Sequence, residues 1–158
     1  MRCLLLQCIL SQNRMGHENP TEKGKIMMAC AEKFGAGAVR NLLRHNRREI
    51  EHSSNHDIDP ERLEQDYILS PDRGMTEYDY FLQRKAELYC YNRKDVNVMV
   101  GWIVTAPQDL TPERYDDFFY ATYDFLANRY GEENVVQAIV HDDEGGQPHL
   151  HFCFIPVE

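Results

Sequence analysis

VVQAIVHDDEGGQPHLHFCFI, residues 135–155, is the stretch of sequence that decides the fold. Residues 135–140 are mostly apolar and β-branched, and residues 149–155 form a second apolar run. Both patterns are typical of β-strands. The connection between them, residues 142–148, is short and contains two adjacent glycines. The sequence therefore predicts a β-hairpin in this part of the chain.

Three histidines of this hairpin are predicted to face one another. His149 and His151 lie two residues apart, and side chains alternate along a strand, so both point to one side of the sheet. The hairpin partner brings His141 alongside them. Three converging imidazoles with open coordination positions are typical of a divalent-metal site that does chemistry. Acidic residues follow directly: Asp142, Asp143 and Glu144.

The alternative interpretation is that these histidines are ordinary core or surface residues, which is the more frequent situation for a single histidine on a strand. Three histidines that faced a core without an ion would leave several polar nitrogens unsatisfied, which costs free energy. The three together therefore favour the metal site.

The composition is that of one acidic domain. The chain has 158 residues, of which 42% are hydrophobic, so it can bury a substantial core. Its formal charge of −9 argues, taken alone, against nucleic acid as a partner. The charge is unevenly distributed, however: residues 20–50 hold seven basic and three acidic side chains, and residues 107–144 hold ten acidic and two basic ones. A local basic surface can bind phosphate even on an acidic protein.

The cysteines and the N-terminal stretch indicate where the protein works. Five cysteines are scattered and lack C-x-x-C spacing, which is typical of buried thiols in a reducing compartment, so we expect a cytoplasmic protein. The apolar run at residues 3–10 is too short to span a membrane and lacks a signal-peptide cleavage site. We expect residues 1–25 to be a flexible extension and residues 26–158 to form the folded domain.

The rest of the chain is predicted to alternate strands and helices. Strands are expected at residues 26–32, 65–69 and 96–106, and helices at residues 36–51, 76–90 and 112–130. The last helix has the clearest signals, with Thr111 as N-cap, Pro112 at its first position and Gly131 beyond its end. Its expected buried side contains Tyr115, Phe118, Phe119, Thr122, Leu126 and Tyr130. Together with the hairpin, this order predicts an α+β fold with helices packed on the faces of a largely antiparallel sheet.

The helix expected at residues 36–51 separates apolar from basic side chains. One stripe is apolar and the other side is basic: Val39, Leu42, Leu43 and Ile50 against Arg40, Arg44, Arg47 and Arg48. His45 lies on the border between the two. From this pattern alone, the arginines form a solvated face and His45 is a surface residue among them.

Three separated blocks match, in order, the motifs of one known family. RHNRR at residues 44–48 matches a His-Asn-x-Arg motif, and NHDIDPER at residues 55–62 is similar to an Asn-x-Asp-Ile-Asn/Asp-Pro segment. HDDEGGQPHLH at residues 141–151 is similar to a His-x-Asp-Glu-x-x-Pro-His-x-His metal motif. With these blocks, residues 26–158 resemble the MobV (Pre/Mob) family of plasmid mobilisation relaxases, members of the HUH endonuclease superfamily.

The resemblance implies an HUH-type relaxase fold and site- and strand-specific nicking of plasmid DNA at a transfer origin, for conjugative mobilisation or plasmid recombination. A side chain attacks the scissile phosphate, which leaves a free 3′-OH and joins the protein to the 5′ end. MobV relaxases are associated with a histidine nucleophile in the first motif, here His45, and a neutral imidazole is nucleophilic near neutral pH. The resemblance also implies Mn²⁺ or Mg²⁺ on His141, His149 and His151, and single-stranded or supercoiled origin DNA as the partner.

Other side chains receive roles on the same basis. Arg48 can neutralise phosphate charge beside His45. Glu144 can hold the tautomer of the nucleophile or move its proton. DNA contacts are expected from Arg44, Asn46, Arg47 and Arg93. Three tyrosines remain alternative nucleophiles: Tyr67, Tyr78 and Tyr80.

The chain departs from the family pattern at two positions. Residues 145–147 stand where the family has two residues between Glu and Pro, and EQDY at residues 64–67 replaces a His-x-Asn-Tyr segment. Family members also continue with a long C-terminal region associated with dimerisation and membrane attachment. We therefore expect a catalytic domain incomplete at its C-terminus, and a homodimer only of a full-length form. Two other functions stay open: a catalytically inactive DNA-binding remnant, and an unrelated histidine-metal phosphodiesterase that uses activated water.

Overall fold

The structure, a computed structural model, describes residues 29–50, 58–91, 93, 95–144 and 146–157. Within these residues, one antiparallel five-stranded sheet has the order β1-β3-β5-β4-β2. Its strands are β1 (Ala29–Gly35), β2 (Tyr67–Ile68), β3 (Asn97–Thr105), β4 (Val135–His141) and β5 (His149–Phe154). The α-helices are α2 (Ala36–Asn46), α3 (Glu77–Glu87) and α4 (Tyr115–Tyr130), and single 3₁₀ turns lie at Leu63–Gln65, Pro112–Arg114 and Glu132–Asn134. The predicted α+β class is confirmed.

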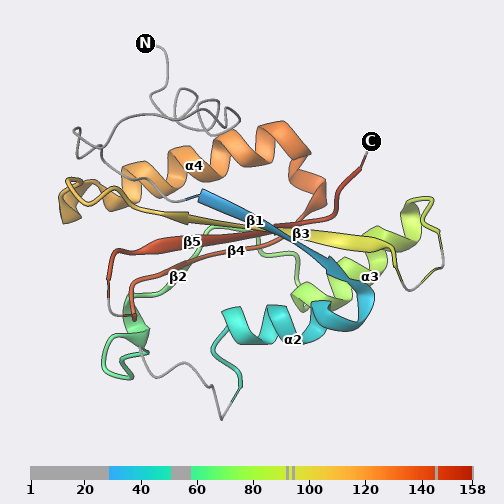
Figure 1. Cartoon of the computed structure of the whole chain (residues 1–158), viewed down its shortest axis with the longest axis horizontal. Coiled ribbons are helices and arrows are strands. Elements are labelled where there is room, and N and C mark those ends of the chain that lie inside the picture. Colours follow the sequence, from blue (N-terminus) through green and yellow to red (C-terminus); the bar gives the residue numbers. More distant parts are fainter. Residues whose placement is uncertain (1–28, 51–57, 92, 94, 145, 158) are drawn as a thin grey trace, which may run out of the picture.

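Helices cover both faces of the sheet (Figure 1). Helix α4 lies on one face, and α2 and α3 lie on the other. Under α4 the sheet contributes Val104, Val140, Leu150, Phe152 and Phe154 to an apolar core. Under α2 and α3 a second cluster forms around Val39, Leu43, Phe81, Met99 and Cys153. Each face of β5 therefore belongs to a different core.

The predicted hairpin of β4 and β5 is confirmed. His141 pairs directly with His149, and Ile139 pairs with His151. Because side chains alternate along each strand, the three histidines lie on the α2 side of the sheet, whereas Leu150 lies on the α4 side. The register that packs the apolar residues under α4 thus gathers the histidines on the opposite face.

Helix α4 begins and ends close to the predicted positions. Its first turn is 3₁₀, starting at Pro112, and the chain leaves the helix at Gly131, whose φ of 86° favours glycine. Phe119, Thr122 and Leu126 are buried as predicted. The prediction was wrong in part: Tyr123 and Ala127 are also buried, whereas Tyr115, Phe118 and Tyr130 are only half-buried. The helix places its central positions, one turn apart, deepest over the sheet.

Helix α2 ends earlier than predicted. It stops at Asn46, and Arg48 adopts a left-handed φ of 58° that turns the chain back toward the sheet. Ile50 therefore lies outside the helix, and the third buried position after Val39 and Leu43 is Asn46. Arg48 was expected on the solvated face of the helix, but this turn directs its side chain away from solvent. Residue 51, the predicted end of the helix, lies outside the described residues.

The bounds of the other elements differ from the predicted ones, and β1 runs to Gly35, three residues beyond its predicted end. Helix α3 ends at Glu87, after an N-cap at Thr76 whose hydroxyl accepts a hydrogen bond from the backbone N–H of Asp79 at 3.1 Å. Strand β2 has two residues rather than five. Strand β1 is described from Ala29, and the predicted flexible extension, residues 1–25, lies outside the described residues.

Two glycines offer a matched test of the backbone. Gly131→Ala is expected to lower the free energy of unfolding by about 1–2 kcal/mol, because φ is positive there and a Cβ would lie 2.7 Å from Glu133 Oε1. Gly37→Ala, in the first turns of α2 with open space around it, is expected to raise it by about 0.5–1 kcal/mol. Urea unfolding of both variants checks the pair; the same sign for both would contradict it.

Candidate active site

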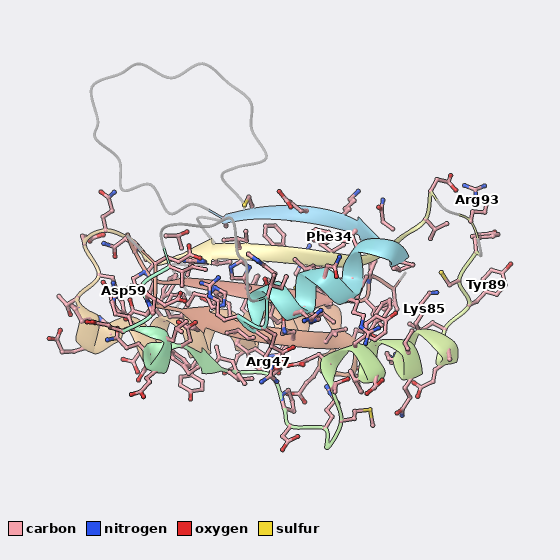
Figure 2. All side chains as sticks on the ribbon, turned by 90° about the horizontal axis from the view of Figure 1, so that it is seen from below. Phe34, Arg47, Asp59, Lys85, Tyr89 and Arg93 are labelled. Atoms are coloured by element: carbon pink, nitrogen blue, oxygen red, sulfur yellow. The ribbon has the colours of Figure 1, made fainter. Side chains whose placement is uncertain are left out.

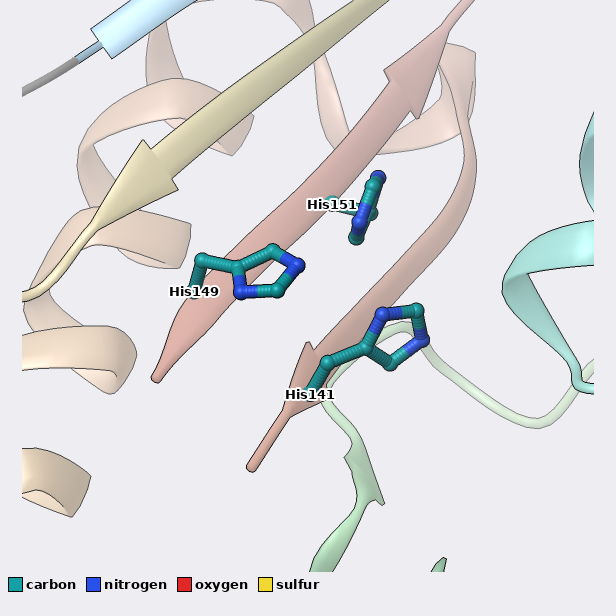
Figure 3. Close-up of side chains that lie close together, drawn as sticks. All are labelled: His141, His149 and His151. Atoms are coloured by element: carbon teal, nitrogen blue, oxygen red, sulfur yellow. The ribbon is translucent and has the colours of Figure 1, made fainter. Parts of the chain in front are cut away.

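The three histidines of the hairpin converge on one point (Figure 3). Their ring centroids are 5.4 Å apart for His141 and His149, 4.6 Å for His141 and His151, and 5.0 Å for His149 and His151. One nitrogen from each ring lies within 4.8 Å of the nitrogens of the other two. Three donor atoms in this arrangement are spaced as ligands of one ion require.

Burial keeps two of these imidazoles neutral. Loss of solvation is the main cause that lowers the pKa of His141 to about 4, with the charge of Arg48 as a second cause. Loss of solvation also lowers the pKa of His151 to about 2, followed by the influence of the neighbouring histidines. Neutral imidazole is the form that binds metal. At neutral pH both rings are therefore ready to act as ligands.

The orientation of His141 is fixed by its neighbours. Its Nε2 lies 2.8 Å from the backbone carbonyl oxygen of Asn46, the last residue of α2. Its Nδ1 lies 3.1 Å from Arg48 Nη2, which can only donate. Nδ1 is therefore the acceptor, and Nε2 carries the proton that it donates to Asn46. This hydrogen bond sets the tautomer, and Nδ1 lies on the side of the other two histidines (Figure 3). The lone pair of Nδ1 accepts from Arg48 here, and a bound ion would have to take the place of that hydrogen bond.

Arg48 is held by carboxylates. Its guanidinium donates to both carboxylate oxygens of Asp143, at 2.8 and 2.6 Å, and to Glu144 at 2.7 Å. The Arg48 side chain is 11% exposed and that of Asp143 is fully buried. Burial opposes the charge of Arg48, but the hydrogen bonds from Asp143 and Glu144 outweigh it and raise its pKa. The left-handed turn after α2 thus inserts a permanent cation beside the histidines.

The acidic start of the loop between β4 and β5 is held by residues 58 and 59. The backbone N–H of Asp59 donates to Asp143 at 2.7 Å, and Ile58 forms an isolated bridge with Glu144. Glu144 lies 3.8 Å from His149 Nε2. Further along the loop, Gly146 has a φ of 131°, which favours glycine. Glu144 itself lies beside the histidines.

Sequence reasoning missed two residues of this region, Asp66 and Arg62. Asp66 accepts a hydrogen bond from the backbone N–H of Asp142 at 2.9 Å and lies 3.9 Å from Arg48. Loss of solvation is the main cause that raises the pKa of Asp66 to about 6. Arg62 donates to Asp142 at 2.7 Å. The available signal was the replacement of the family's asparagine by an acid directly before Tyr67.

His45 lies in the last turn of α2 and is half-buried. Its ring is among the groups whose electrostatic influence lowers the pKa of His151, so the two rings lie within electrostatic reach of each other. The following residue, Asn46, bonds His141 through its backbone carbonyl. The structure therefore brings His45 to the same face of the sheet as the three histidines.

The expected DNA-contacting residues are distributed differently. Arg44 and Arg47 are exposed and border a cleft of about 700 Å³ between α2 and the start of α3. Arg47 also donates from Nε to Glu77 at 2.6 Å. The Asn46 side chain points into the interior and is 1% exposed. Arg93 pairs with Asp95 at 2.7 Å and lies at the opposite end of the sheet from Asp59 (Figure 2).

The three tyrosines considered as nucleophiles do not join this cluster. Tyr67 pairs with Val140 and packs with the α4 core, so it lies on the other face of the sheet, where burial raises its pKa. Tyr80 donates its hydroxyl to the carbonyl of Glu133 at 2.7 Å. Tyr78 stacks on Phe81 of the same helix.

The local charges favour a divalent cation at the histidines. Asp66, Asp142, Asp143 and Glu144 surround the site together with Arg48 and Arg62. With all of them ionised, four negative and two positive charges remain beside neutral imidazoles, which a dication would balance. The donor set fits Mn²⁺, which accepts both imidazole and carboxylate ligands.

Comparison with known proteins places the chain in a family. Residues 23–158 match the sequence profile Mob_Pre, described as "Plasmid recombination enzyme". The chain belongs to the Mob_Pre family. It is 33% identical over 141 residues to a plasmid recombination enzyme of Streptococcus agalactiae, covering 84% of this chain and 28% of that protein. It is 34% identical over 138 residues to the type 1 enzyme of Staphylococcus aureus, covering 83% of this chain and 34% of that protein.

Solved structures of one Mob_Pre protein share the fold. The relaxase domain of MobM, bound to origin DNA of plasmid pMV158 and to Mn, superposes with a TM-score of 0.71 at 34% identity. The match covers 84% of this chain and 71% of the MobM chain. The complex with a 26-nucleotide origin DNA gives a TM-score of 0.59 at 26% identity. The Mob_Pre chain described here therefore spans about a third or less of the curated relatives' length, but most of a solved relaxase domain.

None of the helices in the described residues is both long enough and apolar enough to cross a membrane.

Asp66→Asn is expected to stabilise the protein at neutral pH. The pKa of Asp66 is higher in the folded state than in the unfolded state, so its contribution to stability is present below about pH 4 and is lost as pH rises through about 6. Asparagine keeps an oxygen for the N–H of Asp142. The variant should gain about 1 kcal/mol at pH 7 and nothing below about pH 4 in urea unfolding. A loss of stability at pH 7 would show that the pairing with Arg48 outweighs burial.

Proposed function

We propose that this Mob_Pre chain contains the catalytic domain, residues 26–158, of a cytoplasmic relaxase that nicks one strand of plasmid DNA at a transfer origin. The observation that carries the proposal is the meeting of the His45 turn and the three hairpin histidines on one face of the sheet. A relative with the same fold is bound to origin DNA and Mn. Conjugative mobilisation or plasmid recombination is the process served, and any homodimer belongs to a longer form of the protein.

His141, His149 and His151 are the proposed ligands of Mn²⁺ or Mg²⁺. When bound, the ion supplies Lewis-acid polarisation of the scissile phosphate. The low pKa values of His141 and His151 support this assignment, because protons then compete weakly for the ligands. Crystal structures of the MobM relaxase domain are Mn-bound at pH 6.8, 5.5 and 4.6.

His45 is the proposed nucleophile. A neutral ring nitrogen attacks the scissile phosphorus, a new N–P bond forms, and the P–O3′ bond breaks. The attacking imidazole loses its N–H proton, and the departing O3′ gains one, so the products are a free 3′-OH and a 5′-phosphoryl-histidine. The N–P bond retains the energy of the phosphodiester, so the reverse reaction can reseal the strand.

Arg48 and Glu144, which are hydrogen-bonded to each other, are proposed to hold and assist the catalytic residues. Because Arg48 is bonded to Asp143, Glu144 and His141, its role is to fix the acidic loop and His141 at least as much as to meet phosphate. Glu144, 3.8 Å from His149, is available to accept or return a proton at the edge of the site.

The origin DNA is proposed to lie along the cleft bordered by Arg44 and Arg47. Arg40 borders the same cleft, so three guanidiniums line it together with the carboxylates of Glu49, Glu77 and Asp79. Electrostatic contacts of this kind bind the phosphate backbone without reading sequence. Arg93, at the far end of the sheet, can meet only a distant part of the same DNA. Asn46 belongs to the interior and contributes by holding α2.

Two alternative functions, an inactive DNA-binding remnant and a hydrolase, would give different reaction products from a relaxase. A DNA-binding remnant would bind Mn²⁺ and origin DNA without cleaving either strand. A hydrolase that uses activated water would cleave DNA but leave no protein on the 5′ end. The relatives at 33% and 34% identity favour the relaxase over the unrelated hydrolase, and cleavage of origin DNA separates it from the remnant.

His45→Ala is expected to abolish the covalent protein–DNA adduct. The purified chain, with Mn²⁺ and a labelled single-stranded oligonucleotide carrying its cognate origin, should form an adduct that survives denaturing electrophoresis. The variant removes the attacking nitrogen but none of the metal ligands, so Mn²⁺ binding should persist. Gln83→Ala, on the exposed side of α3, serves as the matched control and should react like the parent. An adduct that forms undiminished with His45→Ala would overturn the assignment of the nucleophile.

The metal-free protein, prepared with a chelator, is expected to lose stability as pH falls below about 6.5. His141 and His151 have folded pKa values of about 4 and about 2, both below the unfolded value, so the unfolded state binds the extra protons. The free energy of unfolding should fall by about 1–2 kcal/mol per pH unit between about pH 6 and 5. Urea unfolding in the Asp66→Asn background removes the opposing titration of that carboxyl. A free energy that stays level across this range would contradict the buried, neutral state of the two rings.

A further inference from the structure

The last turn of α2 is joined to β4 by two side chains. The final carbonyls of a helix lack partners within the helix. Here Gln137 Nε2 donates to the Leu43 carbonyl at 3.1 Å, and His141 Nε2 donates to the Asn46 carbonyl at 2.8 Å. Gln137 Oε1 in turn accepts from Asn46 Nδ2 at 2.9 Å. The Gln137 amide therefore forms one bond to the helix backbone and one to a helix side chain.

A β-bulge aims Gln137 at the helix. Val135 pairs with Phe154 and Gln137 pairs with Cys153, so Val136 is an extra residue in β4. Val136 packs in the cluster under α2 and α3, and Gln137 beside it faces the same helices. Regular alternation would send one of the two to the α4 side. The bulge thus gives β4 an apolar and a polar contact with this layer at adjacent positions.

The bonded amides lie in an apolar interior. Gln137 is fully buried and Asn46 is 1% exposed. Cys153 Sγ lies 3.7 Å from Asn46 Nδ2, and the Leu43 side chain belongs to the same cluster. Apolar side chains tolerate small shifts against one another, whereas a buried amide is satisfied only where its partners sit. The hydrogen bonds between Gln137 and α2 therefore hold the end of the helix at one position on the sheet.

His45 lies between the two bonded residues of α2, two positions after Leu43 and one before Asn46. We infer that Gln137 is a positioning residue, which holds the last turn of α2 so that His45 stands at a fixed distance from the metal-binding histidines. The inference rests on the proposed function, in which His45 attacks a phosphate at those histidines. A displacement of about 1 Å in such a centre can lower the rate about 100-fold.

The test uses a pair of variants that separates positioning from folding. Gln137→Met removes both amide bonds at similar side-chain length and leaves the buried Asn46 amide with Cys153 Sγ alone as a partner, so it is expected to lower stability. The double variant Asn46→Leu with Gln137→Met replaces both amides by apolar groups, so most of that stability should return. The Asn46 carbonyl remains for His141 in both. Gln83→Met, an exposed glutamine on α3, is the matched control.

The expected result is that the double variant is folded but slow. Its kcat for adduct formation should be about 10- to 100-fold below that of the parent, with the KM for origin DNA and the Mn²⁺ affinity from calorimetric titration close to the parent's. A purely structural role predicts that kcat recovers together with stability. Recovery of kcat in the double variant would therefore overturn the inference.

A second measurement does not depend on nicking. With Co²⁺ as the bound ion, the ring protons of His45 acquire a pseudocontact shift that depends on their distance and direction from the metal. The parent and Gln83→Met should give the same shift, and the double variant a smaller or averaged one. An unchanged shift overturns the positioning role. If the parent itself forms no adduct, the proposed function fails, whereas the Co²⁺ shift still decides whether Gln137 positions His45.

Discussion

The register of β4 against β5 is the constraint on which the rest of the site depends. His141 lies opposite His149 and Ile139 lies opposite His151, so the three histidines point toward α2. Leu150, which lies between two of them on β5, points toward α4. A slip of one residue would reverse both faces of a strand. Leu150 and Phe152, fully buried under α4, make such a slip costly. The apolar core on one face therefore fixes the three histidines on the other.

The second constraint is the sharp end of α2. An α-helix that ran on to residue 51 would carry Arg48 around to the solvent, four residues after Arg44. The left-handed φ of Arg48 instead turns the chain and places the guanidinium between Asp143 and Glu144. A non-glycine residue in this conformation is disfavoured by local sterics. The bidentate bond to a fully buried carboxylate offsets that cost, so the distorted residue and the ion pair depend on each other.

Local patterns in the sequence were sufficient to predict the hairpin and its histidine cluster. Alternation along residues 135–155 predicted the hairpin and the meeting of His141, His149 and His151, because side-chain direction follows from position along a strand. Periodicity could not predict that α2 ends at Asn46, because the partner that holds Arg48 comes from residue 143. The family resemblance implied Asn46 as a DNA contact, whereas a bulge in β4 places Gln137 beneath it. Contacts across some ninety residues leave no period in the sequence.

The acidity of the chain, which taken alone argued against DNA, has a local explanation at this site. Four carboxylates gather around the histidines, and two arginines balance only part of their charge. A phosphate that approached this surface by itself would meet net negative charge in a partly buried setting, where Coulomb repulsion is strong. A dication at the three histidines would balance that net negative charge. The acidic residues thus favour a cation at the histidines, and the balanced charge removes the repulsion that a phosphate would otherwise meet at this surface.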